Sequence, residues 1–306
     1  MYLWLIKERA FHTAVLAMDS VPKLFIENVN GSLSKQALEA LKCCHSLVWQ
    51  KEAEHMWRMS REIGIHVVVP LDGDQPLHRY TIHDCAPSTF LLQRLSLDDL
   101  RRTRYARISM EIFPWSLDDG EESNNKCLNS VFANAKHVEK LRMGCADRFD
   151  SLFQNFFPLS VSTIEITTCT FAKNSVFPEW LQKTLRSNSL QELSIRWTTV
   201  EGRTIDVEED IFHQSLAYRR NLKICMFNNR KLTNLNAEFF QRALDLWTNL
   251  EKPFPRKIRY DSPYFSQEGS DPLRNGYFKG EESILHKSGS GKVTWKQSAT
   301  EMIFTP

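Results

Sequence analysis

The chain has 306 residues, 42% of them hydrophobic and 25% charged, which predicts a globular protein with one large domain or a small and a large one. Its formal net charge of +2, with a pI near 8.1, excludes binding to nucleic acid or an acidic membrane that depends mainly on net charge. The seven cysteines form no C-x-x-C pair, so the sequence indicates neither a zinc knuckle nor a disulfide scaffold and favours a reducing compartment.

Residues 1–17 begin with apolar residues, as a signal peptide does, but Lys7, Glu8 and Arg9 interrupt the run and no small-residue cleavage site follows. We interpret this segment as an extension. Apolar runs elsewhere, such as IHVVVPL, are much shorter than the roughly 18 residues that a membrane span needs. The sequence therefore predicts a protein of the cytoplasm or nucleus, with no membrane partner.

Residues 18–60 predict short amphipathic helices. A first helix is expected to begin at Pro22, because a first helical turn does not need the backbone N–H that proline lacks. Apolar residues then recur at steps of three and four, at Leu24, Phe25, Val29 and Leu33. A second run ends at Trp49 and contains Ala37, Leu38, Leu41, Leu47 and Val48. Two or three short helices cannot bury so much apolar surface alone, so the segment requires a partner.

The segment VPKLFIENVNGSL resembles the opening of the F-box, in which Leu-Pro precedes an apolar run and Ile and Leu stand four residues apart. Val21 and Pro22 match the Leu-Pro pair, and Val29 and Leu33 match the Ile and Leu. The resemblance implies that these helices bind the Skp adaptor of a cullin-RING ubiquitin ligase. The adaptor-binding residues are then Val21, Pro22, Phe25, Val29, Leu33, Leu38, Leu41 and Trp49. From the apolar pattern alone, an ordinary pair of core helices is the alternative.

From residue 61 onward the pattern changes to strand alternation. Residues 65–69 and 78–82 alternate apolar and polar side chains and flank PLDGDQPL, whose Asp-Gly and Pro are typical of turns. This arrangement predicts a β-hairpin directly after the helices.

A short pattern, apolar-x-x-apolar-x-apolar, then recurs along the chain. Six copies begin at Leu92, Tyr105, Val138, Val161, Leu190 and Leu222, and the last four begin 23, 29 and 32 residues apart. Helical patterns precede three of them, at 127–135, 177–187 and 208–220. Residues 61–306 are therefore predicted to form a leucine-rich-repeat-like α/β solenoid, a curved parallel sheet backed by helices. Unrelated strands of an ordinary α/β domain are the alternative.

The best copy is VSTIEITTCTF, in which Cys169 and Phe171 stand where leucine-rich repeats place their Asn or Cys and the next Leu. An F-box followed by divergent leucine-rich-like repeats resembles the nematode F-box-associated families. This resemblance implies a substrate receptor that holds an unknown protein target for ubiquitin ligation. No residue would then perform chemistry, and we expect no catalytic residue, metal or cofactor.

Two further segments have compositions that occur in binding sites. Phe254, Tyr260 and Phe265 lie among basic and proline residues; we predict that they cap the open end of the repeats, because near-neutral net charge disfavours the alternative of a nucleic-acid platform. KSGSGKV at 287–293 lacks the phosphate-loop spacing and predicts a hairpin turn. Two rival functions stay open: a repeat-based protein-binding module without a ligase role, and an enzyme with a dispersed site.

Overall fold

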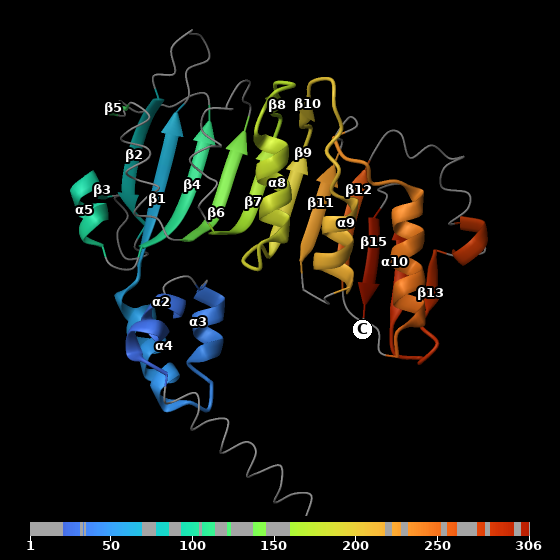
Figure 1. Cartoon of the computed structure of the whole chain (residues 1–306), viewed down its shortest axis with the longest axis horizontal. Helices are drawn as coiled ribbons and strands as arrows, with labels where there is room; N and C mark the ends of the chain where they lie inside the picture. The colour runs from blue at the N-terminus through green and yellow to red at the C-terminus, as the bar shows by residue number, and fades with distance from the viewer. Residues whose placement is uncertain are drawn as a thin grey trace, which may run out of the picture.

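The protein is a mixed α/β structure with one large, mostly parallel sheet and several helices (Figure 1). The computed structural model describes residues 21–30, 33, 35–68, 78–85, 93–103, 106–113, 121–123, 137–144, 160–217, 222–227, 232–251, 256–261, 274–278, 282–296 and 301–305. The predicted extension at 1–17 and the predicted helix at 127–135 lie outside these residues.

Three short helices precede the sheet and are called the helical unit here: α2 (Lys23–Asn30), α3 (Lys35–Leu41) and α4 (Leu47–Met59). Leu38 of α3 packs against Ala53 and Met56 of α4. The expectation that one amphipathic run ends at Trp49 is wrong, because a new helix, α4, begins at Leu47 and Trp49 lies in its first turn. The Ser46 hydroxyl accepts a hydrogen bond from the Trp49 backbone N–H at 3.4 Å and caps a new helix.

The centre of the sheet consists of parallel strands that follow one another in space in the order in which they occur in the chain. They are β1 (Arg61–Val68), β4 (Ala106–Phe113), β6 (His137–Gly144), β7 (Ser160–Thr167), β9 (Glu192–Arg196), β11 (Lys223–Phe227) and β12 (Arg256–Asp261). Antiparallel strands extend both ends: β2 (His78–Asp84), β3 (Gln93–Leu95) and β5 (Glu121–Ser123) beside β1, and β15 (Glu301–Thr305), β14 (Lys292–Lys296) and β13 (Ser283–Leu285) beside β12.

One face of each central strand is apolar, and the cross-strand register aligns these residues into rows. The central row, all of it buried, contains Ile65, Met110, Leu141, Ile164, Leu193, Ile224 and Ile258. Because side chains alternate along a strand, the residues between them point to the opposite face. We call that opposite face the polar face; it includes His66, Glu111, Lys140, Arg142, Glu165, Ser194, Arg196, Lys223 and Cys225.

The helices of the sheet region pack on the apolar face: α5 (Leu97–Arg102), α8 (Phe177–Arg186), α9 (Glu208–Ile211) with the π-helical turn η1 (Phe212–Ala217), and α10 (Ala237–Asn249) (Figure 1). A further π-helical turn, η2 (Arg274–Phe278), contributes Phe278 to the same core. Helix α8 shows why. Phe177, Trp180, Leu181, Thr184 and Leu185 are spaced three and four apart, so they form one buried stripe.

Two consecutive segments have the same local structure, 29 residues apart. Strand β8 (Thr170–Phe171) pairs in parallel with β10 (Thr199–Val200), which joins the loops that follow β7 and β9. Thr168 and Trp197 each follow a sheet strand with positive φ, 56° and 49° respectively. The next residues are also equivalent: the Cys169 thiol contacts the Thr167 carbonyl at 3.5 Å, and the Thr198 hydroxyl donates to the Arg196 carbonyl at 2.9 Å.

Most of the predicted elements are confirmed. Strands β1 and β2 form the expected antiparallel hairpin, although its turn lies outside the described residues. Helices α8 and α9 occupy the predicted segments. Strands β13 and β14 are joined by a turn at 286–291, where Gly289 has a φ of 73°, as KSGSGKV predicts. Burial of Cys169 and Phe171 agrees with the positions assigned to them in the best copy of the pattern.

Three expectations are corrected. The copy at Leu222 was assigned one residue out of register, since Ile224 and Met226 point into the core, whereas Cys225 lies on the polar face. The copy at Leu92 is not a central strand, because β3 is a short antiparallel strand at the edge. Tyr260 lies on β12 within the sheet rather than on a separate cap, and Phe254 and Phe265 lie outside the described residues.

Candidate functional site

The surface of the helical unit carries large exposed apolar side chains. On α2, Leu24 is 68% exposed and Phe25 is 55% exposed. On α4, Leu47 and Met59 are also exposed. Water contact with so much aliphatic and aromatic surface is unfavourable. The adjacent pair Leu24 and Phe25 is the candidate for a surface that another protein covers, whereas Leu47 and Met59 lie at opposite ends of α4.

The structure divides the predicted adaptor-binding residues into three groups. Pro22 and Phe25 are exposed at the start of α2. Leu38 and Trp49 are buried inside the helical unit, so they contribute to its packing. The remaining predicted residues are half-buried: Val21, Val29, Leu33 and Leu41.

Sequence reasoning missed the residue that anchors α2. Ile26 is fully buried, although the predicted stripe passed from Leu24 and Phe25 to Val29 and left it out. An ion pair adds to this contact, because the Lys23 ammonium lies 3.7 Å from the mostly buried Glu52 carboxylate of α4. Since Ile26 faces inward, its neighbours Leu24 and Phe25 are turned outward.

The polar face carries a continuous chain of charges over its first strands. The Arg142 guanidinium of β6 donates to the Glu111 carboxylate of β4 at 2.9 Å and to the Glu165 carboxylate of β7 at 2.8 Å. Lys140 lies 2.8 Å from Glu165, and the His66 ring lies 3.6 Å from Glu111. Each carboxylate and each cation of this chain has a group of opposite charge beside it.

Charge pairing also changes the acidities in this chain. Burial raises the pKa of Glu165, but hydrogen bonds from Lys140 and Arg142 outweigh it and hold the pKa below its ordinary value. Hydrogen bonds to Glu111 and Glu165 raise the pKa of Arg142. Both groups are therefore charged at neutral pH, and the chain is a structural clamp across three strands.

The polar face differs at the next strands, β9 and β11. The row continues from Glu165 to two small side chains, Ser194 and Cys225. Arg196 and Lys223 are exposed, and no ion pair of either residue occurs within the described part of the chain. On this face of β9 and β11 the two exposed cations outnumber the single carboxylate, Glu192, which lies opposite Lys223.

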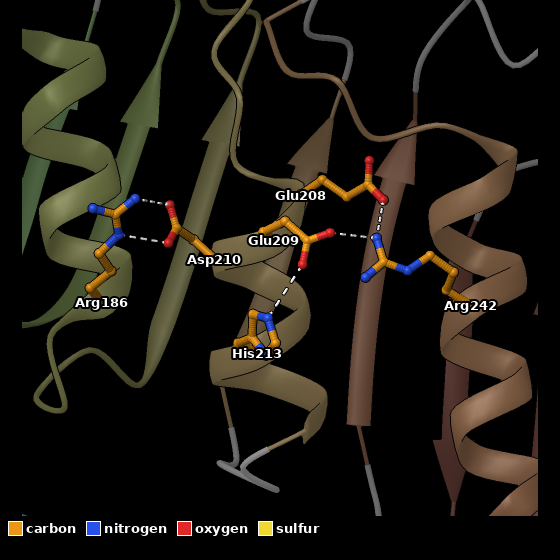
Figure 2. A network of polar contacts seen from close by, with 6 residues as sticks. All are labelled: Arg186, Glu208, Glu209, Asp210, His213 and Arg242. Carbon is orange, nitrogen blue, oxygen red and sulfur yellow. Dashed lines mark hydrogen bonds and ion pairs between the residues drawn. The ribbon is translucent and has the colours of Figure 1, made fainter.

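The opposite side of the sheet holds a second charged network, between the helices (Figure 2). Arg186 of α8 makes a two-point contact with Asp210 of α9, at 2.7 and 3.2 Å. Arg242 of α10 donates to Glu208 and Glu209 of α9 at 2.6 and 2.7 Å, and His213 lies 3.3 Å from Glu209. These pairs join neighbouring helices and satisfy one another, so we assign them a structural role.

The described residues give little support for metal binding, phosphate binding or a membrane-spanning helix. They contain no group of three or more His, Cys, Asp or Glu side chains that could hold a metal ion. The KSGSGKV turn follows the buried His286, whose ring nitrogen Nε2 lies 3.1 Å from the Trp247 carbonyl. Among the described helices, none has the length and apolar character needed to cross a membrane.

Comparison with known proteins finds no matching family model, no matching curated protein and no matching solved structure. Function is therefore inferred from two surfaces, the exposed apolar side chains of the helical unit and the polar face of the sheet.

Proposed function

We propose that this chain is a substrate-recruiting F-box subunit of an SCF-type ubiquitin ligase. The helical unit, within predicted residues 18–60, binds the Skp adaptor. The sheet region, within predicted residues 61–306, is a leucine-rich-repeat-like solenoid that holds a protein target near the ubiquitin-charged enzyme. The chain itself performs no chemistry.

The exposed pair Leu24 and Phe25 is the observation that carries the adaptor proposal. Both residues lie on α2, within the segment that resembles the F-box opening, and both are more than half exposed. Covering one such side chain completely in an interface contributes about 1.5–3 kcal/mol. An adaptor groove that takes both residues would remove the most unfavourable part of the surface of this unit.

The order of the parallel strands supports the solenoid. In doubly wound sheets, ligands bind in a crevice where the strand order reverses. Here the order runs from β1 to β12 without reversal, so the parallel sheet offers no such crevice. Repeated contacts at similar sequence intervals, such as Arg186 with Asp210 and Thr170 with Thr199, also fit units that stack on their neighbours.

Adaptor binding is tested with the full chain and purified Skp adaptor by biolayer interferometry. The unaltered chain is expected to bind, and Leu24→Asp combined with Phe25→Asp to weaken binding at least about 100-fold, because two charges would enter an apolar interface. Leu285→Asp is the matched control, since Leu285 is an exposed leucine at the far end of the sheet. Circular dichroism melting checks that all three proteins fold.

Two results would contradict the proposal. One is absence of adaptor binding by the folded, unaltered chain, which would favour a repeat-based binding module without a ligase role. The other is equal binding by the double variant and the control, which would place the adaptor contact elsewhere.

A further inference from the structure

Trp197 combines an exposed indole with a strained backbone. It follows β9 directly, has a φ of 49°, and is 47% exposed. Positive φ is unfavourable for a bulky residue, because its Cβ approaches the neighbouring carbonyl oxygen. Such an outlier persists only where the surrounding structure enforces it, and it is a reason to look for function.

The surrounding backbone holds Trp197 from both sides. The Arg196 carbonyl accepts hydrogen bonds from the Thr168 backbone N–H and the Thr198 hydroxyl, each at 2.9 Å. The Thr199 N–H donates to the Cys169 carbonyl at 3.0 Å. These hydrogen bonds fix the backbone from which the indole projects, so a partner that contacts Trp197 has little backbone to order.

Comparison with Thr168 shows which features of Trp197 the fold requires. Thr168 occupies the equivalent position 29 residues earlier, with the same backbone conformation. The repeated loop therefore requires positive φ, which glycine or asparagine supplies with less strain. It does not require an indole, since threonine serves at the equivalent position. Tryptophan is among the residues that most often dominate binding energy at protein interfaces.

Two exposed cations on the polar face of β9 and β11 indicate the chemistry of the partner. Arg196 directly precedes Trp197, and Lys223 lies on the neighbouring strand β11, opposite Glu192 and four strand positions from Arg196. Both are exposed, and in the described residues no ion pair joins Lys223 to Glu192 opposite it. By contrast, the cations Lys140 and Arg142 on the ion-paired end of the same face are already neutralised by Glu111 and Glu165.

We propose that Trp197, Arg196 and Lys223 form a docking site for an extended acidic segment of a protein. An apolar side chain of the segment packs on the Trp197 indole, and its carboxylates pair with Arg196 and Lys223. Arg196 and Lys223 are offset by four strand positions, about 13 Å at the usual rise, so the two carboxylates stand about four residues apart. Only the identification of this segment as part of a ubiquitination target rests on the proposed function.

The probe is a phage-displayed library of random 12-residue peptides, selected on the immobilised full chain. Selected peptides are expected to be rich in Asp and Glu, with one large apolar residue. Each is then synthesised and titrated against the chain and its variants by fluorescence anisotropy at low and high salt. Its affinity is expected to fall at high salt, because the contacts to Arg196 and Lys223 are exposed ion pairs.

Substitutions separate docking from folding. Trp197→Ala and Trp197→Gly both remove the indole and are expected to weaken peptide binding at least about tenfold. The glycine variant is expected to melt about 2–4 °C above the alanine variant, because glycine relieves the positive φ. Thr168→Gly, at the equivalent position, is the matched control and leaves peptide binding unchanged. Arg196→Glu weakens acidic peptides and spares any neutral ones.

The following results would contradict the docking site or separate it from the proposed ligase role. Selection of no acidic peptides, or acidic peptides that bind Trp197→Ala and Arg196→Glu as well as the unaltered chain, would overturn it. Adaptor binding is measured on the same variants and is expected to stay unchanged. If the unaltered chain binds acidic peptides but does not bind the adaptor, the proposed ligase role is contradicted and this docking site is not.

Discussion

The helical unit and the sheet region solve the burial of apolar side chains in different ways. Of the six large hydrophobic side chains exposed in the described residues, four lie in the helical unit: Leu24, Phe25, Leu47 and Met59. Within its described residues the sheet region exposes Trp197 and Leu285 alone, and the buried ones form one continuous core. A small helical unit cannot enclose its own apolar residues, whereas stacked strands and helices can. The free energy of unfolding should therefore depend mainly on the sheet core, and the proposed adaptor binding on the exposed side chains of the helical unit.

The largest expected effect sharpens this contrast. Phe177→Ala should destabilise the protein by about 3–5 kcal/mol, because it leaves a cavity in the core. The Phe177 ring is fully buried and stacks on Phe171 with ring centroids 4.0 Å apart. Leu24→Ala on the helical surface should change the free energy of unfolding by no more than about 0.5 kcal/mol. Urea unfolding measures both, and equal losses would remove the distinction between the two regions.

A smaller effect tests the repeated loop within the sheet region. Thr198→Val keeps the shape of a fully buried side chain and removes its hydrogen bond to the Arg196 carbonyl. The expected loss is about 1 kcal/mol, measured by urea unfolding. Thr199→Val, one residue later and less buried, is the control. If both changes cost the same, the Thr198 hydroxyl has no special part in holding the loop.

The smallest effect depends on pH and concerns the polar face. The pKa of Glu165 is below its ordinary value in the folded protein, so its ion pairs stabilise at neutral pH and lose this contribution as pH falls through the folded pKa. Glu165→Gln should cost less than about 1 kcal/mol at pH 7, because the pairs are partly exposed, and nothing at a pH below that pKa. Unfolding free energies measured across this range check the expectation. A constant difference at all pH values would mean that packing, rather than charge, is responsible.

Much of the fold follows from local patterns that favour one secondary structure over the others. The strand patterns at 65–69 and 78–82, with turn residues between, favour a hairpin, and β1 and β2 form it. The stripe from Phe177 to Leu185 fits helix spacing, and α8 buries all of it. At Leu222 the pattern has two solutions, because Leu222, Ile224 and Met226 alternate as well as Cys225 and Phe227 do. Pairing with β9 selects the first, since a slip of one residue turns every side chain to the other face.

The candidate surfaces were predicted only in part. The F-box resemblance led to Phe25, which is exposed, but also to Leu38 and Trp49, which are buried. In a short helix, the spacing of apolar residues does not show which side faces the neighbouring helices. In α2 the residue on that side is Ile26. No sequence signal marks Trp197, because positive φ at a non-glycine residue is imposed by hydrogen bonds from the neighbouring segment at 168–169.

The sequence by itself determined the alternation of strand and helix and the change from helix to strand spacing near residue 61. Both depend on the period of apolar residues along the chain. Only the tertiary structure decided the order of the parallel strands, the pairing of charges from Glu111 to Glu165, and the exposure of Trp197 beside Arg196. These features join residues far apart in sequence through cross-strand contacts. Such contacts follow from the packing of whole units against each other, which no local pattern encodes.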